Sequence, residues 1–327
     1  MLKRLINQAI INLKISPRDP LLIKSGQPSL SGAKLAFVRT YRIPGAAAEG
    51  QPYLPGSSLK GVLRSFAEKV CRTMRPAPLP VCLPYQDPGK EAVRDPQQDS
   101  CGSVLESFKK ENSITSSEVY RVSCPICRLF GSHSFVGRLA VSDAYLQGAY
   151  KLEIRDGVAI DRFTGGTVPG HIFTAEVLTQ GDFQTTLELR NFELWQLGLV
   201  ALLLEELSDE NYGQITLGSG KSRGLGRFLG VVEKFHLVYF HQAPDHLTGL
   251  CGLCTPEECT AYDFFPETGD HPIPLPAPES NGLRQVFDLT DTWKETLQPA
   301  KDDLSAYIAA VNWPGALTPY RVEERPA

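Results

Sequence analysis

The sequence lacks any apolar run long enough to cross a membrane. None approaches the ~18 apolar residues that a spanning helix needs. Residues 1–15 also lack the small-residue cleavage pattern of a secretory signal peptide. These absences argue against a membrane or secreted protein and predict a cytoplasmic one without a membrane partner. In that compartment the 8 cysteines are expected to be thiols or metal ligands, because disulfides are rare there.

The sequence also lacks an evident catalytic constellation. No Ser/His/Asp or Cys/His nucleophile set stands out, although the chain contains 6 histidines. Acidic residues are scarce beside the basic loops, since the long loop of residues 16–53 contains only Asp19 and Glu49. No catalytic residue is therefore predicted from the residues alone.

Positive charge is concentrated at the front of the chain. Residues 1–75 contain 13 Lys or Arg and 3 Asp or Glu, whereas residues 231–327 contain 6 and 15, and the net charge is -4. A basic segment can bind a polyanion locally even in a chain of acidic net charge. The alternative is that the asymmetry is incidental.

Hydrophobic periodicity predicts alternating strands and helices. The expected elements are a strand over 5–15, a helix from about Ser57 to Arg75, strands over 138–145 and 172–178, a buried helix over 194–207 and a strand over 227–240. The order strand, helix, strand, strand, helix, strand is that of an α+β, ferredoxin-like (RRM-like) core over residues 1–240. Residues 76–132 are expected to be an insertion, unstructured before Cys124. Residues 241–327 are expected to be an irregular, acidic extension with one helix at about 297–311.

The segment Leu54-Pro-Gly-Ser-Ser-Leu-Lys-Gly-Val-Leu-Arg-Ser predicts a tight turn that leads into a helix. Ser57 and Ser58 supply capping hydroxyls, and Lys60 and Arg64 share one helix face because they are four residues apart. Backbone amides at a helix N-terminus, beside these hydroxyls and cations, suit a phosphate oxygen. A capped surface helix with two solvated charges is the alternative.

A glycine-rich segment, Gly218-Ser-Gly-Lys-Ser-Arg-Gly-Leu-Gly-Arg, is a second candidate anion site. It does not match the P-loop, because Ile215 stands where the first glycine belongs. Its exposed amides, with Lys221, Arg223 and Arg227, suit a nucleic-acid backbone without reading the bases. A plain glycine-rich hairpin is the alternative.

Cysteine spacing predicts a structural zinc site. Cys124 and Cys127 form a two-ligand turn, and the upstream Cys82 and Cys101 complete the set, with Cys71 and His133 as reserves. Free thiols are the alternative, and a thioredoxin-type redox site fits less well because its strand and helix context is missing. A second possible site comprises Cys251, Cys254, Cys259 and His246.

Four motifs in this order resemble one family. They are Leu-Pro-Gly-Ser-Ser-Leu-Lys-Gly-Val-Leu-Arg-Ser (54–65), Cys-Pro-Ile-Cys-Arg-Leu-Phe-Gly-Ser (124–132), Arg-Asp-Gly-Val-Ala-Ile-Asp-Arg-Phe-Thr-Gly-Gly-Thr (155–167) and Leu-Gly-Ser-Gly-Lys-Ser-Arg-Gly-Leu-Gly-Arg (217–227). Residues 1–235 are thereby similar to the RAMP proteins of type III CRISPR effector complexes, in particular the Cas-seven-like backbone subunit.

The resemblance implies RNA-guided antiviral defence in a ribonucleoprotein complex. Partners would be CRISPR RNA, target RNA, other RAMP subunits and the large subunit of the complex. A thumb hairpin at residues 146–171 would wedge into the guide–target duplex, and the insertion cysteines match a zinc-bearing module of the family. The implied RNA-binding residues are Ser57, Ser58, Lys60, Arg64, Arg162, Lys221, Ser222 and Arg223.

The sequence departs from the family at the expected catalytic position. Active members carry an aspartate in the long loop, supporting metal-dependent cleavage of target RNA, and Lys34 stands there in this chain. A lysine does not bind a divalent cation as a carboxylate does, so the resemblance implies a non-cleaving subunit.

Two other functions stay open at this stage. One is a metal-dependent target-RNA endonuclease, with Asp19 as the fallback catalytic carboxylate and magnesium or a similar ion as cofactor. The other is a stand-alone zinc scaffold protein.

Overall fold

A large antiparallel sheet organises the molecule. The computed structural model describes residues 2–25, 35–41, 50–83, 100–267 and 273–320, so Lys34 and Glu49 lie outside the described residues. The strands follow the order β10-β11-β9-β1-β8-β7-β3-β2, and β6 pairs with β8 beside them. The last two in this order are β3 (Gln51–Leu54) and β2 (Arg39–Thr40). The α+β class is therefore confirmed.

The centre of the sheet is β1 (Asn7–Pro17), flanked by β8 (Thr167–Arg190) and β9 (Phe228–Phe240). Both neighbours run antiparallel to β1. Alternate residues of β1 are buried, as the period of a strand with one covered face requires. This strand buries Ala9, Ile11, Leu13 and Ile15.

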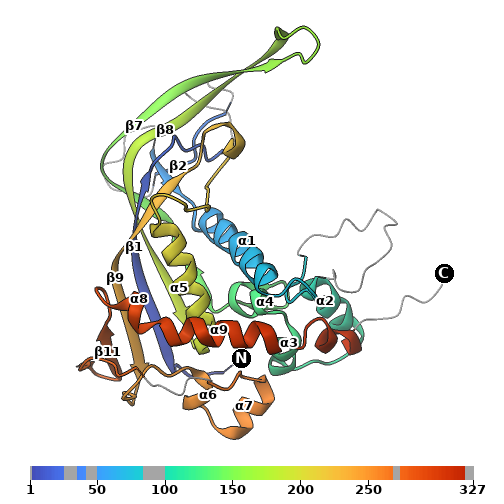
Figure 1. The fold of residues 1–327 in the computed structure, drawn as a ribbon, viewed down its shortest axis with the longest axis vertical. Helices are drawn as coiled ribbons and strands as arrows, with labels where there is room; N and C mark the ends of the chain where they lie inside the picture. The colour runs from blue at the N-terminus through green and yellow to red at the C-terminus, as the bar shows by residue number, and fades with distance from the viewer. Residues whose placement is uncertain (1, 26–34, 42–49, 84–99, 268–272, 321–327) are drawn as a thin grey trace, which may run out of the picture.

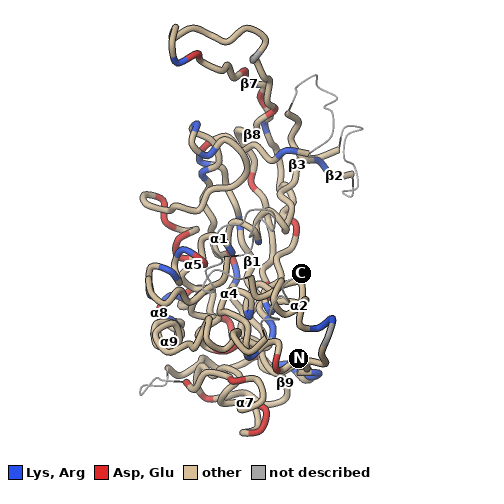
Figure 2. The backbone as a smooth tube through the Cα atoms, turned by 90° about the vertical axis from the view of Figure 1, so that its right-hand side faces the viewer, with Lys and Arg blue, Asp and Glu red and all other residues tan. Residues whose placement is uncertain are grey.

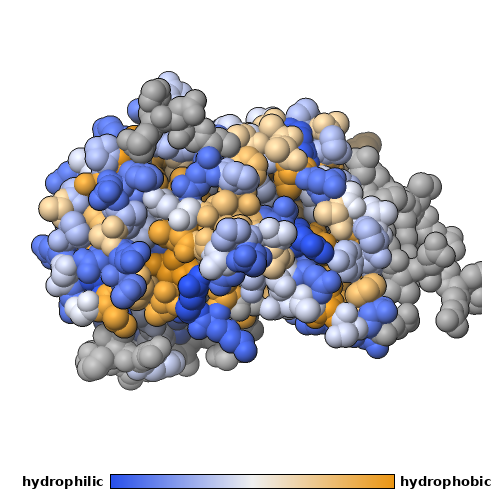
Figure 3. All heavy atoms as spheres, turned by 90° about the horizontal axis from the view of Figure 1, so that it is seen from below, coloured by the Kyte–Doolittle hydropathy of each residue, from blue (hydrophilic) through white to orange (hydrophobic). Residues whose placement is uncertain are grey.

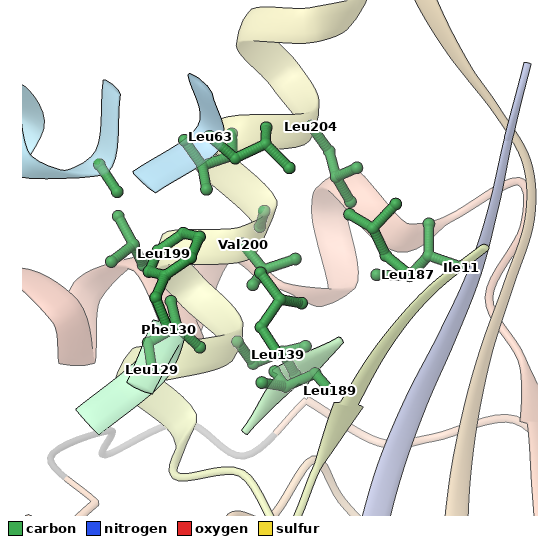
Figure 4. Packing of buried hydrophobic residues seen from close by; sticks show 14 of the residues in the cluster. Ile11, Leu63, Leu129, Phe130, Leu139, Leu187, Leu189, Leu199, Val200 and Leu204 are labelled. Carbon is green, nitrogen blue, oxygen red and sulfur yellow. The ribbon is translucent and has the colours of Figure 1, made fainter. Parts of the chain in front are cut away.

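Helices α1 (Gly56–Met74), α5 (Leu194–Ser208) and α9 (Gln298–Ala310) lie on one side of the sheet (Figure 1). The two helices predicted over residues 57–75 and 194–207 are confirmed nearly to the residue. Their apolar side chains meet those of the strands, as Leu63, Leu204 and Leu187 illustrate in Figure 4. No helix in the described part of the chain is both long and apolar enough to cross a bilayer.

The strand predicted over residues 138–145 is in fact two strands, β6 (Leu139–Val141) and the beginning of β7 (Ala144–Ile160). Ser142 and Asp143 separate the two strands and belong to neither. There the Ser142 amide donates to the Thr186 carbonyl at 3.0 Å, and Asp143 accepts from the first amide of α1. Both segments still pair with β8.

A long β-hairpin projects from the sheet at the top of Figure 1. It consists of β7 and the first part of β8, and it contains the thumb segment predicted at residues 146–171. The strand register shifts between Gln147 and Lys151, so the ladder is interrupted near the base of the hairpin. Large apolar side chains are exposed along it, including Ile154, Ile160 and the fully exposed Phe163 at the tip.

The insertion is more ordered than predicted. Residues 101–122, expected to be irregular, form α2 (Cys101–Glu111) and α3 (Ser116–Val122), which precede α4 (Pro125–Phe130). Capping explains the difference: Ser100 caps α2, and Thr115 with Glu118 forms a capping box on α3. A small hairpin of β4 (Gly131–Ser132) and β5 (Phe135–Val136) follows.

The described part of the C-terminal extension is more ordered than predicted, and the one helix expected there, at about 297–311, is confirmed as α9. The extension forms several elements, namely α6 (Leu250–Leu253), α7 (Pro256–Tyr262), β10 (Glu279–Asn281), β11 (Arg284–Asp288), α8 (Trp293–Thr296), α9 and the 3-10 helix η3 (Gly315–Tyr320). Strand β11 pairs with β9, and the ring of Tyr307 on α9 stacks on Trp195 of α5 with centroids 4.1 Å apart.

Gly198 explains how α9 comes so close to α5. A Cβ at this position would lie 1.9 Å from the Ala300 carbonyl oxygen, so only glycine fits there. The extension therefore shares the hydrophobic core of the preceding residues. Seen from the end that carries α6 and α7, hydrophobic residues form a band between hydrophilic ones (Figure 3).

Candidate nucleic-acid interface and metal centre

Four cysteines from three separate segments meet in the insertion. Cys82 follows α1, Cys101 begins α2, Cys124 is the N-cap of α4 and Cys127 lies within α4. All four are buried, and their sulfurs lie within 4.8 Å of one another. These are the four residues predicted from spacing, and the structure brings them together.

The distances between the sulfurs suit a tetrahedral metal. Cys82 Sγ lies 3.6 Å from both Cys124 Sγ and Cys127 Sγ. A tetrahedron with Zn–S bonds of 2.3 Å has edges of about 3.8 Å, whereas a disulfide would place two sulfurs about 2.05 Å apart. The four thiols could therefore hold a metal ion such as zinc.

The thiols of the cluster are poised to share negative charge. Burial opposes ionisation of Cys124, but hydrogen bonds from Cys101, Cys127 and Cys82 hold its pKa well below the ordinary thiol value. Burial raises the pKa of Cys101 well above that value. A divalent cation bound among them would replace the remaining protons, since thiolates are the metal-binding form.

The reserve ligands lie outside this cluster. Cys71 is buried on α1, where burial raises the pKa of its thiol to about 12 and so keeps it protonated. His133 is exposed in the β4–β5 turn, with Nδ1 3.9 Å from the Glu106 carboxylate. Neither belongs to the group of four sulfurs.

The second cysteine site is not assembled. Among the described residues, Cys251, Cys254, Cys259 and His246 do not form a group with metal-ligand spacing. The Cys259 thiol instead donates to the Cys251 carbonyl oxygen at 3.4 Å. His246, which precedes α6 in the chain, forms an isolated β-bridge with Pro274.

The N-terminus of α1 differs from the predicted phosphate site. Its first amide, from Gly56, donates to Asp143 Oδ1 at 2.7 Å, and the Ser58 and Leu59 amides donate to the Pro55 carbonyl. Gly56 is buried against the end of β6, where a Cβ would lie 2.4 Å from the Val141 carbonyl oxygen. A carboxylate of the protein therefore already caps this helix, although Ser57 is exposed.

Lys60 and Arg64, predicted to act together, have different surroundings. Lys60 is half-buried, and burial followed by the charge of Arg64 lowers the pKa of its amine. Arg64 points into the insertion: its Nη1 donates to the Gly131 carbonyl at 2.9 Å and its Nη2 to Cys127 Sγ at 3.4 Å. The geometry thus supports an anion contact for Lys60 and not for Arg64.

The glycine-rich loop is pinned at its ends and exposed at its tip. The Ser219 amide donates to the Leu22 carbonyl at 2.8 Å, and the Gly226 amide donates to the Pro20 carbonyl at 3.0 Å. Between these anchors lies the 3-10 turn η2 (Lys221–Arg223), flanked by glycines with φ of +82° and +73°. The side chains of Lys221 and Ser222 are exposed and have no hydrogen bond or ion pair to other described residues.

The loop and the hairpin meet through Arg223. Its guanidinium lies 5.3 Å from the centroid of the Phe173 ring on β8, which is a cation–π contact. The Phe173 ring in turn covers Gly157 of β7, where a Cβ would lie 2.2 Å from it. Arg162, the remaining predicted cation, is exposed at the hairpin tip. Figure 2 shows Lys and Arg on the glycine-rich loop in the upper half of the view, and Asp and Glu around α7 at the opposite end.

Asp19 is not a free carboxylate. Arg227 donates to it twice, from Nε at 2.7 Å and from Nη2 at 3.2 Å. Its fallback role as a metal-binding or catalytic acid would require that this ion pair be broken. Lys34, at the expected catalytic position, lies outside the described residues.

Two residues at the hairpin base were not foreseen. The Glu176 carboxylate is buried on β8 and accepts from the Phe37 amide at 3.1 Å and from Arg39 Nη2 at 2.6 Å. The backbones also meet, since the Leu21 and Leu178 amides donate to each other's carbonyls and the Leu35 amide donates to the Thr174 carbonyl. The sequence signal for Glu176 was its position as an acidic residue directly before the apolar Val177 and Leu178 of a buried strand.

These features define a class of protein: a mixed α and β chain with one open sheet face, a projecting hairpin and a cationic loop beside it. The model of the RAMP superfamily matches residues 20–229, which is more than half of the chain, and the chain belongs to this superfamily. At the level of the superfamily it is a CRISPR-associated, RNA-binding subunit. No curated protein matches the sequence.

Proposed function

We propose that this chain is a structural backbone subunit of a type III CRISPR effector complex, with a ferredoxin-like core that holds the CRISPR RNA backbone and the guide–target duplex. The observation that carries the proposal is the exposed Lys221-Ser222-Arg223 turn, held by its glycines at the base of the hairpin. Backbone amides and cations in such a turn suit phosphates. Its partners would be CRISPR RNA, target RNA, other RAMP subunits and the large subunit.

The open face of the sheet is a poor RNA platform in this chain. It carries charges of both signs that pair with each other, such as Lys14 with Asp182 at 2.7 Å and Arg190 with Glu188. Of the described aromatic side chains that are exposed, Tyr41, Phe163 and Tyr212, none lies on β1 or β9. RNA bases stack on exposed aromatics in sheet-face readers, so we place the RNA at the loop end of the sheet.

The proposed contact set follows the geometry. Lys60, Lys221 and Ser222 would contact phosphates, Arg223 would do so while holding Phe173, and Arg162 would contact the duplex at the hairpin tip. Ser57 and Ser58 stay in the proposal as hydroxyl donors only, because Asp143 takes the first amide of α1. Arg64 is withdrawn.

We further propose that the four-cysteine cluster holds structural zinc. Cys82, Cys101, Cys124 and Cys127 would be its ligands. A bound ion would cross-link the end of α1 to α2 and α4. Such a cross-link would add to the stability of the insertion.

Cleavage of target RNA is not part of the proposed function. Lys34 replaces the expected aspartate, and the nearest fallback, Asp19, is paired with Arg227. Such an ion pair does not favour magnesium binding, since the cation would have to displace the guanidinium. The assembled complex with Lys34→Asp is the test: gain of a target cut that wild type lacks would support the proposal.

Co-purification tests the binding function. Short guide RNA that co-purifies with the chain, and an affinity that falls with salt without dependence on guide sequence, is the expected result. An RNA-free, zinc-containing monomer would instead favour a stand-alone zinc scaffold.

A further inference from the structure

One face of α1 carries a row of charges directed at the cysteine cluster. Arg64, Glu68 and Arg72 occupy successive i,i+4 positions and therefore lie one above another. Glu68 is buried between the two arginines. Its Oε1 accepts from Arg64 Nε at 3.3 Å and its Oε2 accepts from Arg72 Nη2 at 3.4 Å.

Both arginines also reach residues of the cluster. Arg64 Nη2 donates to Cys127 Sγ at 3.4 Å, and Arg72 Nη2 donates to the Cys82 carbonyl at 3.2 Å. With Nη1 on the Gly131 carbonyl, all three nitrogens of the Arg64 guanidinium have partners inside the protein. Each nitrogen of the Arg64 guanidinium thus already has a partner, and none is left over to bind a phosphate.

The hydrogen bond from Arg64 to Cys127 places a positive charge beside a cluster that would be negative with a metal bound. Four thiolates around a divalent cation have a net charge of about −2, and a buried charge is costly unless a counter-charge neutralises it. Among the described residues, Arg64 is the cation that donates a hydrogen bond to a cluster sulfur. A guanidinium suits this role because it stays charged when buried and forms several bonds at fixed angles.

We propose that Arg64 belongs to the metal centre: its guanidinium hydrogen-bonds the Cys127 thiolate, offsets the negative charge of the cluster and fixes α1 against the insertion. The inference rests on the proposed zinc site. Loss of a residue that supports a metal ligand in this way typically weakens metal binding by about 10- to 100-fold.

The experiment compares zinc binding by the full chain and three variants. Arg64→Gln removes the charge, Arg64→Lys keeps the charge but not the planar fork, and Lys69→Gln removes a charge from an exposed position of α1 as the matched control. Zinc affinity is measured by competition with a chromophoric chelator. The absorption of the cobalt-substituted protein reports whether four thiolates still bind.

We expect zinc affinity to fall by about 10- to 100-fold in Arg64→Gln, to fall less in Arg64→Lys, and to match wild type in Lys69→Gln. The cobalt spectrum should keep its sulfur bands, because the four ligands are intact. If Arg64→Gln does not fold, Arg64→Lys alone decides, and wild-type zinc affinity in it would overturn the inference.

Two further outcomes separate the inference from the proposals beneath it. Wild-type zinc affinity in Arg64→Gln, together with weakened RNA binding, would return Arg64 to the phosphate contacts. A folded wild-type chain that binds no zinc would refute the zinc site itself, whatever the variants do.

Discussion

Lys60 is the residue of α1 best placed to take a phosphate. Its amine is half-buried beside Arg64, and burial with that neighbouring charge lowers its pKa, so an incoming anion would stabilise the charged form. Lys60→Gln should weaken RNA binding equally for all guide sequences and reduce the slope of log affinity against log salt by about 1.

The control for Lys60 is Lys69→Gln, which removes an exposed charge from the same helix. RNA titrations over a range of salt concentrations would measure both variants. Equal RNA affinity and equal salt slope for Lys60→Gln and wild type would contradict the proposed phosphate contact.

Asp19 supports structure through Arg227 at the foot of the glycine-rich loop. Its replacement by asparagine should leave the target RNA uncut, as in wild type, and should slightly loosen the loop. Target-cleavage assays of the assembled complex, wild type and Asp19→Asn, would show whether the target RNA is cut. A wild-type complex that cuts, and an Asp19→Asn complex that has lost one cut, would mean that the subunit is a nuclease.

At the scale of elements, the sequence predicted what periodicity and spacing control. The apolar pattern placed α1 and α5 within a residue or two. Ligand spacing selected Cys124 and Cys127, and their place in the insertion added Cys82 and Cys101. The pattern could not show that Asp143, between β6 and β7, caps α1, because that contact depends on tertiary packing.

The same limit applies to the side chains of α1 and to the extension. Lys60 and Arg64 share spacing but not surroundings, since the direction in which Arg64 points is set by the insertion packed against it. In the extension only helix α9 was predicted, and its burial against α5 could not be read from the sequence.

The hairpin makes a separate prediction about duplex binding. Phe163 is fully exposed at its tip, so Phe163→Ala should leave the melting temperature unchanged. If the ring stacks on a base, the variant should lose about 1–3 kcal/mol of binding to the guide–target duplex. Binding measured with duplex and with guide RNA alone would separate the hairpin from the glycine-rich loop, because only the duplex affinity should fall.

At the scale of the whole molecule, Glu267 joins two segments of the extension, which packs against the core. Its Oε1 accepts from the Gly249 and Gly252 amides at 2.8 and 3.2 Å, and burial, opposed by these bonds, raises the pKa of its carboxyl to about 7. The nearby Asp303 contributes to the same rise. The unfolded chain ionises this group near its ordinary value of 4.5.

Stability should therefore fall as the pH rises through this range. Below pH 4.5 both states hold the proton, and between pH 4.5 and 7 the folded state holds it while the unfolded state releases it. The group thus costs about 3 kcal/mol of unfolding free energy by pH 8. Glu267→Gln keeps an oxygen for both amides, so it should be more stable than wild type at pH 8 and similar at pH 4.5. Urea unfolding at both pH values would show this, and parallel pH profiles would contradict it.

The attachment of the hairpin has a mechanical consequence. Described residues before and after position 30 hold its base, where Leu21 bonds to Leu178 and Arg39 to Glu176. Arg223 of the glycine-rich loop packs on Phe173. The hairpin is thus a cantilever with a fixed root and a free tip. Bending of the hairpin is therefore expected beyond this root and not in the sheet. In the proposed complex, the stiffness of the root would set how far the tip can move.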